Sequence, residues 1–433
     1  MNLNHNKWML ERASYENNIK AETMMTSRDL IPDECVKAAL TADKGSKAEL
    51  LTWTVEDIVS EVDNYAALVT SVKVKFSLEQ EEHNVSYVVK LSPDPKKIFG
   101  GFAEALFKKE VGFYGILSNA LSSELERVGE VALRVPKCFY MRGDSGKEII
   151  FLENLLPRGF KMNDRSKGLD VAHTKLILQE LARFHAASLL LLAKVPDRVL
   201  DHRYDFIKID WTNFSDNAKD FLKDFFSMVM KKNSNILHLV GGYRRVEEWL
   251  ARNSERGCDM MESHLQTDVP FDVICHGDCW NNNLLFRYSD TGVPLEVMLL
   301  DMQVCRRASP ALDLNNLLFT SLPGRLRKAN TDDFLATYYD SLSKVLKGGG
   351  MSPPFTLPEL QHEYRNKHGH GLFFGMLSGS TVVSEACGMP ILGTEEEKHS
   401  SQKKFTREML LDCKPLRPLL LDVFDEMVEV GLI

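Results

Sequence analysis

The sequence predicts an α+β fold with two lobes: a small lobe built on an antiparallel β-sheet, and a larger lobe that is mainly helical. Three observations predict this division. Residues 51 to 91 contain three short segments rich in β-branched and aromatic residues, as strands are. Beyond residue 171 the apolar residues recur mostly at helical spacing. Strand-like segments return only between residues 273 and 301, around a run of polar residues that begins at His276.

The bulk composition is that of a soluble globular protein. The chain has 433 residues, enough for two lobes with a sizeable core, and it is 44% hydrophobic and 26% charged. Its net charge of −8 argues against an extended nucleic-acid surface, which needs an excess of Lys and Arg. The longest apolar patch, residues 186–195, is too short to span a bilayer. We therefore expect neither a nucleic-acid partner nor a membrane span, and no obligate protein partner is evident.

The cysteines and the N-terminal residues indicate the compartment. The first residues are polar and lack the apolar core of a signal peptide. The 8 cysteines are scattered without regular spacing, and several lie inside apolar runs. This distribution fits reduced thiols better than a disulfide framework. We expect a cytoplasmic protein.

The small lobe is expected at residues 51–154, after an N-terminal helical segment over residues 1–50 with a helix start at Pro32. Residues 72–76 alternate apolar and basic side chains, the pattern of a half-buried strand. The elements predicted for this lobe are strands at 51–58, 72–76 and 85–91, a helix at 102–114, and a strand pair at 136–140 and 148–152.

The larger lobe is expected at residues 155–433. Residues 155–168 contain proline and two glycines and are predicted as a connector. Three glycines at 348–350, with two prolines shortly after, predict a flexible joint. The elements predicted for this lobe are helices at 171–194, 213–231 and 243–264, and strands at 273–275, 284–288 and 295–301. The last two strands form a predicted hairpin that carries Asn283 and Asp301 at its two ends.

The run from His276 to Asn283, together with Asp301, supplies the groups that phosphoryl transfer from ATP requires. Asp278 is the candidate catalytic base, because a carboxylate can accept the proton of an attacking hydroxyl. Asn283 and Asp301 offer the oxygen ligands that Mg²⁺ prefers. The structural alternative is a loop cap at Asp278 followed by a polar turn. The order and spacing of the three residues favour a kinase that uses ATP and Mg²⁺.

The neighbouring residues indicate which class of kinase. Protein kinases have Arg after the His of this motif and a long activation segment after the metal-binding Asp. Here Gly277 follows the His, and Pro310 comes only a few residues after Asp301. A peptide-binding activation segment does not fit in so short a stretch. The sequence therefore predicts a small-molecule alcohol as acceptor.

A second group of residues is expected to bind the nucleotide. Lys90 lies in an apolar strand, where a lone cation needs a partner, and Glu110 on the next helix is the first candidate for it. Glu104 is the alternative partner, and an edge-strand Lys facing water is the structural alternative. The chain is expected to cross between the lobes at Glu153 and Asn154, where backbone groups would meet the adenine.

Three further residues are expected to support the site without touching the substrates. His276 is predicted to buttress the loop by hydrogen bonding, and Asp313 to bond the backbone or His276. His185 is interpreted as a buried His whose ring nitrogens are satisfied. Zinc is not expected at Cys275 and Cys279, because no second pair of ligands lies at short spacing.

Over roughly residues 50–345 these segments together resemble the ecdysteroid kinase-like family, whose CHK kinase-like domain is related to choline kinases and aminoglycoside phosphotransferases. The matching segments are Asp63 to Ala66, Val89 to Pro93, Phe107 to Tyr114, Phe151 to Leu155, Leu181 to Ala186, Cys275 to Asn283 and Leu300 to Gln303. The resemblance implies a protein-kinase-like fold, with Asn64 in the nucleotide loop. It also implies ATP-dependent phosphorylation of a hydroxyl on an ecdysteroid or a xenobiotic alcohol, in hormone storage or detoxification. Val62 and Met302 depart from the family's usual Gly and aromatic residue.

Two other readings of the same residues stay open. The first is a catalytically weak or silent pseudokinase that binds a lipophilic ligand, and the second is a protein kinase. The acceptor is expected to be bound after residue 303, above all at 365–395. Phe373, Phe374, Met376 and Met389 could line an apolar pocket there, although such residues more often form plain core.

Overall fold

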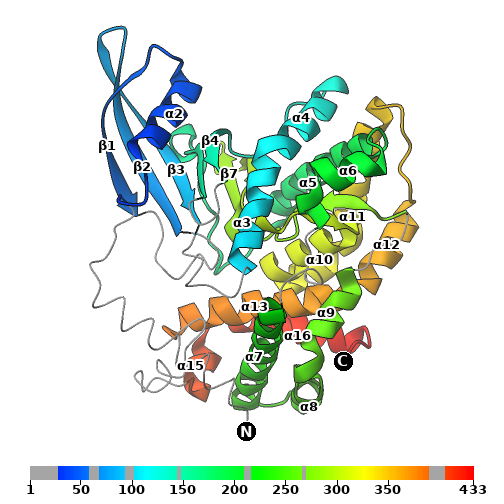
Figure 1. Ribbon diagram of the computed structural model, residues 1–433. Helices are drawn as coiled ribbons and strands as arrows, with labels where there is room; N and C mark the ends of the chain where they lie inside the picture. The colour runs from blue at the N-terminus through cyan, green and yellow to red at the C-terminus, as the bar shows by residue number, and fades with distance from the viewer. Residues whose placement is uncertain are drawn as a thin grey trace. The chain divides into compact units, whose positions relative to one another are not determined.

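The computed structural model describes residues 28–57, 68–92, 102–143, 148–208, 216–265, 270–389 and 405–433. It divides into two compact units (Figure 1). Unit 1 consists of residues 1–107, 137–154 and 389–404; unit 2 consists of residues 108–136, 155–388 and 405–433. A sheet-containing unit and a mainly helical unit make this an α+β protein, as predicted. The expected domain boundaries at residues 51 and 155 stay predictions.

Unit 1 is built on a five-stranded antiparallel sheet with the strand order β1-β2-β3-β5-β4. Its strands are β1 (Glu49–Asp57), β2 (Leu68–Leu78), β3 (Glu81–Leu91), β4 (Cys138–Arg142) and β5 (Ile149–Glu153). Glu79 and Gln80 connect β2 and β3 with positive φ angles of 52° and 70°. Two such residues form the mirror-image turn that matches the twist of a hairpin, here without Gly or Asn. The strand pairs predicted from the sequence are therefore confirmed.

One face of this sheet is covered by helix α2 (Asp33–Lys44), which begins after Pro32 as predicted. Alternate residues of β2 and β3 point to this face and form the core with Val36 and Leu40 of the helix. Two polar contacts hold the helix in place: Trp53 Nε1 donates to Asp33 Oδ1 (2.9 Å), and the Tyr87 hydroxyl donates to Asp43 Oδ2 (3.0 Å).

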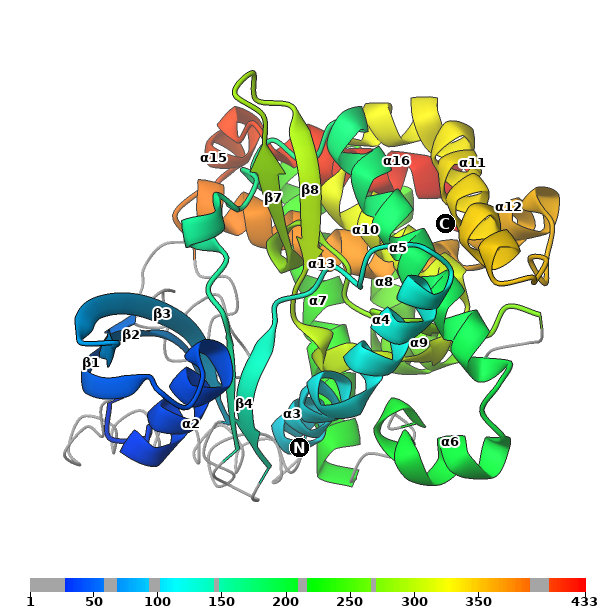
Figure 2. The ribbon, with the colours of Figure 1, turned by 90° about the horizontal axis from the view of Figure 1, so that it is seen from above.

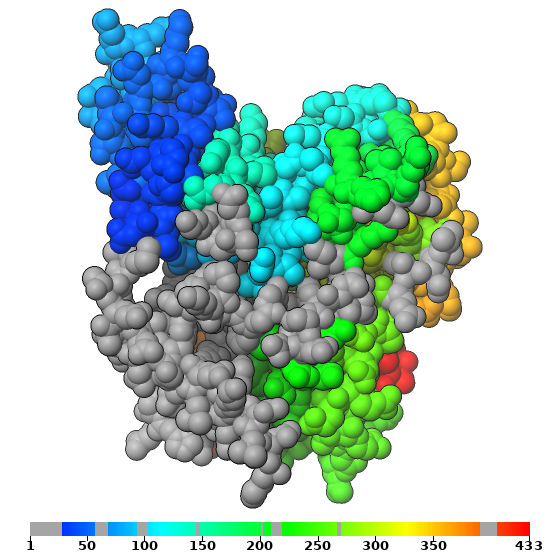
Figure 3. All heavy atoms as spheres, in the orientation of Figure 1, coloured from blue at the N-terminus to red at the C-terminus, as the bar shows by residue number. Residues whose placement is uncertain are grey.

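Unit 2 is mainly helical and contains two short antiparallel strand pairs, β6·β9 and β7·β8. The strands are β6 (Val273–Cys275), β7 (Leu284–Tyr288), β8 (Pro294–Leu299) and β9 (Arg306–Ala308). The helices are α3 (Phe102–Gly112, which begins in unit 1), α4 (Ser118–Arg127), α5 (Val171–Leu192), α6 (Asp197–Arg203), α7 (Asp216–Val240), α8 (Arg244–Asn253), α9 (Gly257–Leu265), α10 (Pro310–Ser321), α11 (Gly324–Gly348), α12 (Leu357–Asn366), α13 (His368–Ala386), α15 (Arg407–Asp412) and α16 (Asp422–Glu429). Figure 3 shows a face of the unit on which α4 (cyan) and α6 (green) are exposed.

Helices α5 and α10 lie at the centre of unit 2. Helix α5 packs against α11 and against β6, and α10 packs against α13 (Figure 2). Every residue of α10 is buried, and its start is fixed by Ser309, whose Oγ accepts the N–H of Ala311, and by Pro310 in the first turn. A helix buried on all sides can hold polar side chains only if they are hydrogen-bonded, which makes its Asp313 and Ser321 informative.

Several predicted elements differ from the observed ones in extent. The helix expected at 102–114 continues through a π-helical turn, Phe113–Leu117, into α4. The helix expected at 243–264 is interrupted by a 3₁₀ turn at Ser254–Arg256, and α7 extends to Val240 rather than 231. At Gly112, the last residue before the π-helical turn, a Cβ would lie 2.4 Å from the Phe206 ring, so the helix packs closely there. Within the described ranges, none of the helices has both the length and the apolar character needed to cross a membrane.

Candidate active site

The β7·β8 hairpin brings Asn283 and Asp301 together, as the sequence predicted for its two ends. Leu284 pairs with Leu299 in the antiparallel register. One step beyond this pair, the N–H of Leu300 donates to Asn283 O (2.9 Å). Asn283 immediately precedes β7, and Asp301 follows Leu300. The hairpin therefore holds both side chains at the same end.

His276 connects the loop before β7 to the segment after β8. Its Nε2 donates to Leu300 O (2.9 Å), and its Nδ1 accepts the N–H of Asp278 (3.3 Å). Burial lowers the pKa of His276, so the ring is neutral and its two nitrogens have opposite roles, one donor and one acceptor. His276 thus fixes Asp278 relative to the residue before Asp301.

Asp278 is half-buried, and its carboxyl receives hydrogen bonds from two neighbouring side chains. Asn283 Nδ2 donates to Asp278 Oδ2 and to Asp278 O, both at 2.9 Å, and the Trp280 side chain also donates to the carboxyl. Burial raises the pKa of Asp278 to about 7, with the charge of Asp301 as the next cause, and the bonds from Asn283 and Trp280 oppose the rise. A carboxyl group in this environment is suited to exchanging a proton near neutral pH.

Asn283 and Asp301 present a donor set that fits a hard divalent cation. The amide nitrogen of Asn283 donates both of its hydrogen bonds to Asp278. The amide oxygen is not used in these bonds and is the atom of Asn283 that can bind a cation. Asp301 contributes a carboxylate, one oxygen of which accepts a bond from Gln303 Nε2 (2.9 Å). Oxygen ligands of this kind are those that Mg²⁺ takes up in proteins.

Asp301 also has an unusual backbone. Its φ of 64° and ψ of 68° lie in the left-handed region, which costs a non-glycine residue roughly 1–2 kcal/mol. The chain passes directly from this residue into a 3₁₀ turn, Met302–Val304. Strained residues persist where the surrounding structure fixes them, and they concentrate at functional sites.

Two side chains of helix α10 bond the backbone of the loop that carries Asp278. The Asp313 carboxylate accepts the N–H of His276 at Oδ2 (2.7 Å) and the N–H of Gly277 at Oδ1 (2.8 Å). Ser321 Oγ accepts the N–H of Asn281 (3.0 Å). Asp313 and Ser321 are about two helical turns apart and so lie on one face of the helix. This face fixes the loop on both sides of Asp278.

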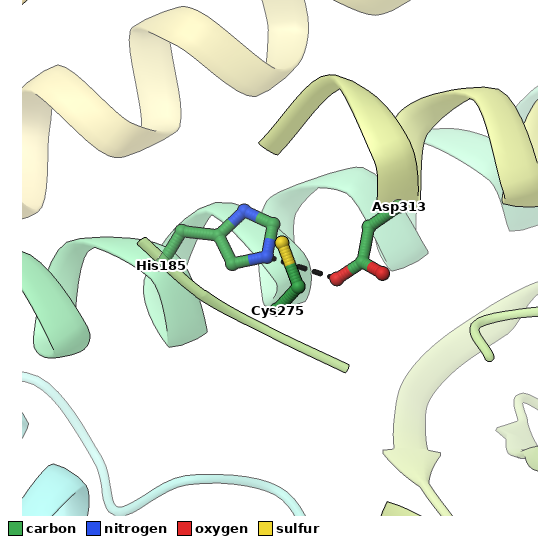
Figure 4. A group of neighbouring side chains, drawn as sticks. All are labelled: His185, Cys275 and Asp313. Atoms are coloured by element: carbon green, nitrogen blue, oxygen red, sulfur yellow. Dashed lines mark hydrogen bonds and ion pairs between the residues drawn. The ribbon is translucent and has the colours of Figure 1, made fainter. Parts of the chain in front are cut away.

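His185 and Tyr338 extend the Asp313 interaction into the core, and Figure 4 shows the His185 ring directed at the carboxylate. His185 Nε2 lies 3.1 Å from Asp313 Oδ2, and its Nδ1 lies 2.7 Å from the Tyr338 hydroxyl. Burial alone would raise the pKa of Asp313, but the hydrogen bond and charge of His185 and the Gly277 N–H outweigh it, and the pKa lies below its usual value. Asp313 is therefore an ionised carboxylate, and both ring nitrogens of His185 are bonded, as predicted for that residue.

His185, Asp313 and Cys275 form a cluster whose possible ligand atoms lie within 4.8 Å of one another (Figure 4). Burial raises the pKa of the Cys275 thiol well above its usual value, so the sulfur keeps its proton. The thiol lies 3.3 Å from Ser309 O and 3.6 Å from Ala308 O, as a donor. Because all three side chains already have hydrogen-bond partners, we interpret the cluster as a hydrogen-bonded support rather than a metal centre.

The residues expected to bind the nucleotide belong partly to unit 1. Lys90 lies on β3 between Val69 and Ile150 and is 9% exposed; the alternation of the strand places it on the face opposite to the α2 core. Asn154 Nδ2 donates to Ser86 Oγ (2.9 Å), and the Glu153 N–H donates to Lys137 O (2.8 Å). Glu110 is a buried residue of α3 in unit 2. Its pairing with Lys90 stays a prediction, and Asn64 lies outside the described residues.

The predictions from the sequence missed four residues that support the site: Ser321, Trp280, Gln303 and Tyr338. Trp280, half-buried, lies inside the motif itself, and its indole N–H was a signal available from the sequence. Gln303 follows Asp301 by two residues and was named only as the end of a segment that resembles the family. Tyr338 is 153 residues from His185, and no pattern in the sequence connects the two.

Comparison with protein families gave a match of the ecdysteroid kinase-like family to residues 61–350. Comparison with curated protein sequences gave no match. Similar solved structures include an ethanolamine kinase from Plasmodium vivax, with 12% identity over 93% of this chain and 85% of that chain and a TM-score of 0.37. A choline kinase from Streptococcus pneumoniae has 13% identity over 91% and 99% of the two chains and a TM-score of 0.36. The GDP complex of aminoglycoside 2′-phosphotransferase-IIIa has 11% identity over 90% and 98% and a TM-score of 0.42. Because these TM-scores are low, the family match carries the comparison.

Gly277 provides a test of how tightly the loop is held. It has a φ of 84°, and a Cβ there would lie 2.4 Å from the backbone oxygen of Val304, in the segment that follows Asp301. Gly277→Ala is expected to lower the melting temperature much more than Gly292→Ala. Gly292 has a φ of 81°, and a Cβ there meets nothing within 4 Å, so its variant carries only the backbone strain of about 1–2 kcal/mol. Equal shifts of the two melting temperatures, measured by differential scanning fluorimetry, would contradict this close packing.

Proposed function

Because the chain belongs to the ecdysteroid kinase-like family, we propose that it is an ATP- and Mg²⁺-dependent kinase that phosphorylates a hydroxyl group of a small lipophilic molecule. We take the acceptor to be an ecdysteroid or a xenobiotic alcohol, and the setting to be hormone storage or detoxification in the cytoplasm. The observation that carries the proposal is the arrangement of Asp278, Asn283 and Asp301 around the backbone of Leu300. It combines a half-buried carboxyl of raised pKa with the oxygen ligands of a divalent cation.

In this proposal Asp278 is the catalytic base. It orients the acceptor hydroxyl, and its carboxylate takes the hydroxyl proton as the new bond to phosphorus forms. The bond from Asn283 Nδ2 to Asp278 Oδ2 fixes the rotation of the carboxyl group, and Trp280 supplies a second fixed donor. His276 and Asp313 act on the backbone of the loop and keep the base in this position.

Asn283 and Asp301 are proposed as the protein ligands of Mg²⁺, through the Asn283 amide oxygen and the Asp301 carboxylate. When bound there, the ion would neutralise negative charge on the phosphate oxygens. Gln303 donates to one Asp301 oxygen and so orients the other. Asn283 contacts the base and provides the ligand with the same amide group, which fixes the metal site and Asp278 relative to each other.

The remaining nucleotide contacts are assigned to the other candidate residues. Lys90 is proposed to bind the α- and β-phosphates, with Glu110 as its partner, as in protein kinases. Asn64 is proposed to lie in the nucleotide loop, and the chain at Glu153 and Asn154 to meet the adenine. Phe373 and Met376, which the sequence offered as possible acceptor contacts, are 3% and 0% exposed, and the Phe373 ring packs 4.1 Å from that of Phe226. These two residues form core.

The alternative in a different class is a silent pseudokinase that binds a lipophilic ligand. Incubation with γ-labelled ATP, Mg²⁺ and a panel of steroid and xenobiotic alcohols discriminates between the two. We expect transfer of label to at least one alcohol, dependent on Mg²⁺. Binding of an alcohol without any transfer of label would favour the pseudokinase, and faster labelling of a protein extract than of any alcohol would favour a protein kinase.

Asp278→Asn is expected to lower the rate of phosphate transfer by about 10²–10⁴-fold, because an amide cannot accept the hydroxyl proton. Nucleotide affinity, measured by isothermal titration calorimetry, should be retained. Asp290→Asn, in the exposed hairpin turn, is the matched control and should keep full activity. If Asp278→Asn transferred phosphate as fast as the wild-type protein, Asp278 would not be the base.

Asp301→Ala is expected to abolish the dependence of nucleotide affinity on Mg²⁺, since it removes the charged ligand of the ion. The measurement is the Kd for a non-hydrolysable ATP analogue with and without Mg²⁺. Asp290→Ala controls for the loss of one surface charge. The same gain in affinity on adding Mg²⁺ to Asp301→Ala and to the wild-type protein would rule out this ligand assignment.

A further inference from the structure

Two half-buried cysteines, Cys387 and Cys413, meet in unit 2 at the ends of helices α13 and α15. Each residue is the C-cap of its helix, and the Cys387 thiol is near enough to Cys413 to raise the pKa of that thiol. Of the other cysteines, Cys138 is half-buried and the rest are buried. The Cys138 thiol lies 3.6 Å from Tyr140 O, on its own strand. The pair at the helix ends therefore combines accessibility with a thiol neighbour.

Two contacts to backbone carbonyls place each thiol at the end of the other cysteine's helix. Cys387 Sγ lies 3.8 Å from Met409 O, which is on α15, one turn before Cys413. Cys413 Sγ lies 3.9 Å from Val383 O, which is on α13, one turn before Cys387. The N–H of Cys387 donates to the same Val383 O (3.0 Å). Each sulfur thus lies against the last turn of the other's helix, and the two helix ends are fixed together.

We propose that Cys387 and Cys413 are a modification site: a thiol pair that a peroxide oxidises to a disulfide joining the ends of α13 and α15. In the first step hydrogen peroxide oxidises one thiol to a sulfenic acid and releases one water. In the second step the other sulfur attacks the sulfenic sulfur, the S–S bond forms, and a second water leaves. Two S–H bonds are broken in all, and the two electrons reduce the peroxide.

The environments of the two sulfurs give the order of the steps. Burial, with the contact to Cys387 as the next cause, raises the pKa of the Cys413 thiol to about 12. Because the thiolate is the nucleophile, Cys413 reacts slowly with a peroxide from solution. We therefore expect Cys387 to be oxidised first and Cys413, whose sulfur lies against the last turn of α13, to close the disulfide.

The first measurement uses the full-length protein and hydrogen peroxide, with peptide mapping by mass spectrometry under non-reducing conditions. We expect a cross-linked peptide containing Cys387 and Cys413, about 2 Da lighter than the sum of the two thiol peptides. It should disappear on treatment with dithiothreitol. Recovery of both residues as free thiols, or of Cys387 as sulfinic acid with Cys413 unchanged, would overturn the proposal.

The second measurement uses single serine variants and dimedone, which labels sulfenic acids. In Cys413→Ser the sulfenic acid on Cys387 has no thiol to react with, so we expect dimedone labelling of Cys387. In Cys387→Ser we expect Cys413 to stay unlabelled. Equal labelling of both variants would contradict the order of oxidation, and no labelling of either would contradict the reactivity of the pair.

The third measurement separates the disulfide from other effects of peroxide. A disulfide between the ends of two helices restricts the unfolded chain, so oxidation should raise the melting temperature of the wild-type protein by a few degrees. Cys138→Ser should show the same rise, and Cys387→Ser none. A rise that persisted in Cys387→Ser would assign the effect to another site. Because these measurements do not use phosphate transfer, they are independent of the proposed kinase activity.

Discussion

The hydrogen bonds that the buried Asp313 carboxylate accepts from the backbone of His276 and Gly277 are the interaction on which the rest of the candidate site depends. An ionised carboxylate inside a protein is strongly unfavourable unless its oxygens are bonded. Here two N–H groups of the loop and the His185 ring meet that requirement together. The loop and the helix therefore need each other. The charge is stable only with the loop in place, and the two N–H groups are satisfied only with the carboxylate present.

A second set of contacts, made by His276 and the β7·β8 hairpin, positions Asp278 and Asn283. His276 bonds Leu300 O on one side and the Asp278 N–H on the other, and the β7·β8 register places Leu300 opposite Asn283. The backbone of the loop is thus held by α10, and its side chains by the hairpin. Asp301, which has a left-handed backbone, follows Leu300, whose N–H and C=O are both bonded to that loop, so the surrounding structure fixes the strained residue.

The parts of the fold that follow local rules could be predicted from the sequence. Alternation at Val72 to Phe76 predicted a strand with one buried face, and the structure has Val72, Val74 and Phe76 buried and Lys73 exposed. The hairpin with Asn283 and Asp301 at its ends followed from two apolar runs and a turn. The family resemblance predicted from the motifs is confirmed by the match over residues 61–350.

What could not be predicted depends on contacts between residues far apart in the chain. His185 was expected to be satisfied, but its partners Tyr338 and Asp313 lie 153 and 128 residues away and were not named. The Phe206 ring packs closely against Gly112, just before the π-helical turn, and no local pattern in the sequence predicts that contact. For Lys90, only part of the environment could be predicted. The alternation of apolar residues predicts its strand and the face on which it lies, whereas its proposed partner Glu110 is on a helix, α3, whose placement local patterns do not determine.

The close approach at Gly277 links these constraints to the class of acceptor. The segment after Asp301 packs its Val304 backbone against Gly277, pairs as β9 with β6 immediately before His276, and then enters α10, which bonds the same loop through Asp313. Between Val304 and Asp313 the chain therefore contacts the loop that carries Asp278, or the strand just before it, three times. In protein kinases the residue that corresponds to Gly277 is an Arg, and a long activation segment follows the metal-binding Asp. A loop held by hydrogen bonds and close packing, with no long activation segment between Asp301 and α10, suits an enzyme whose acceptor is a small molecule.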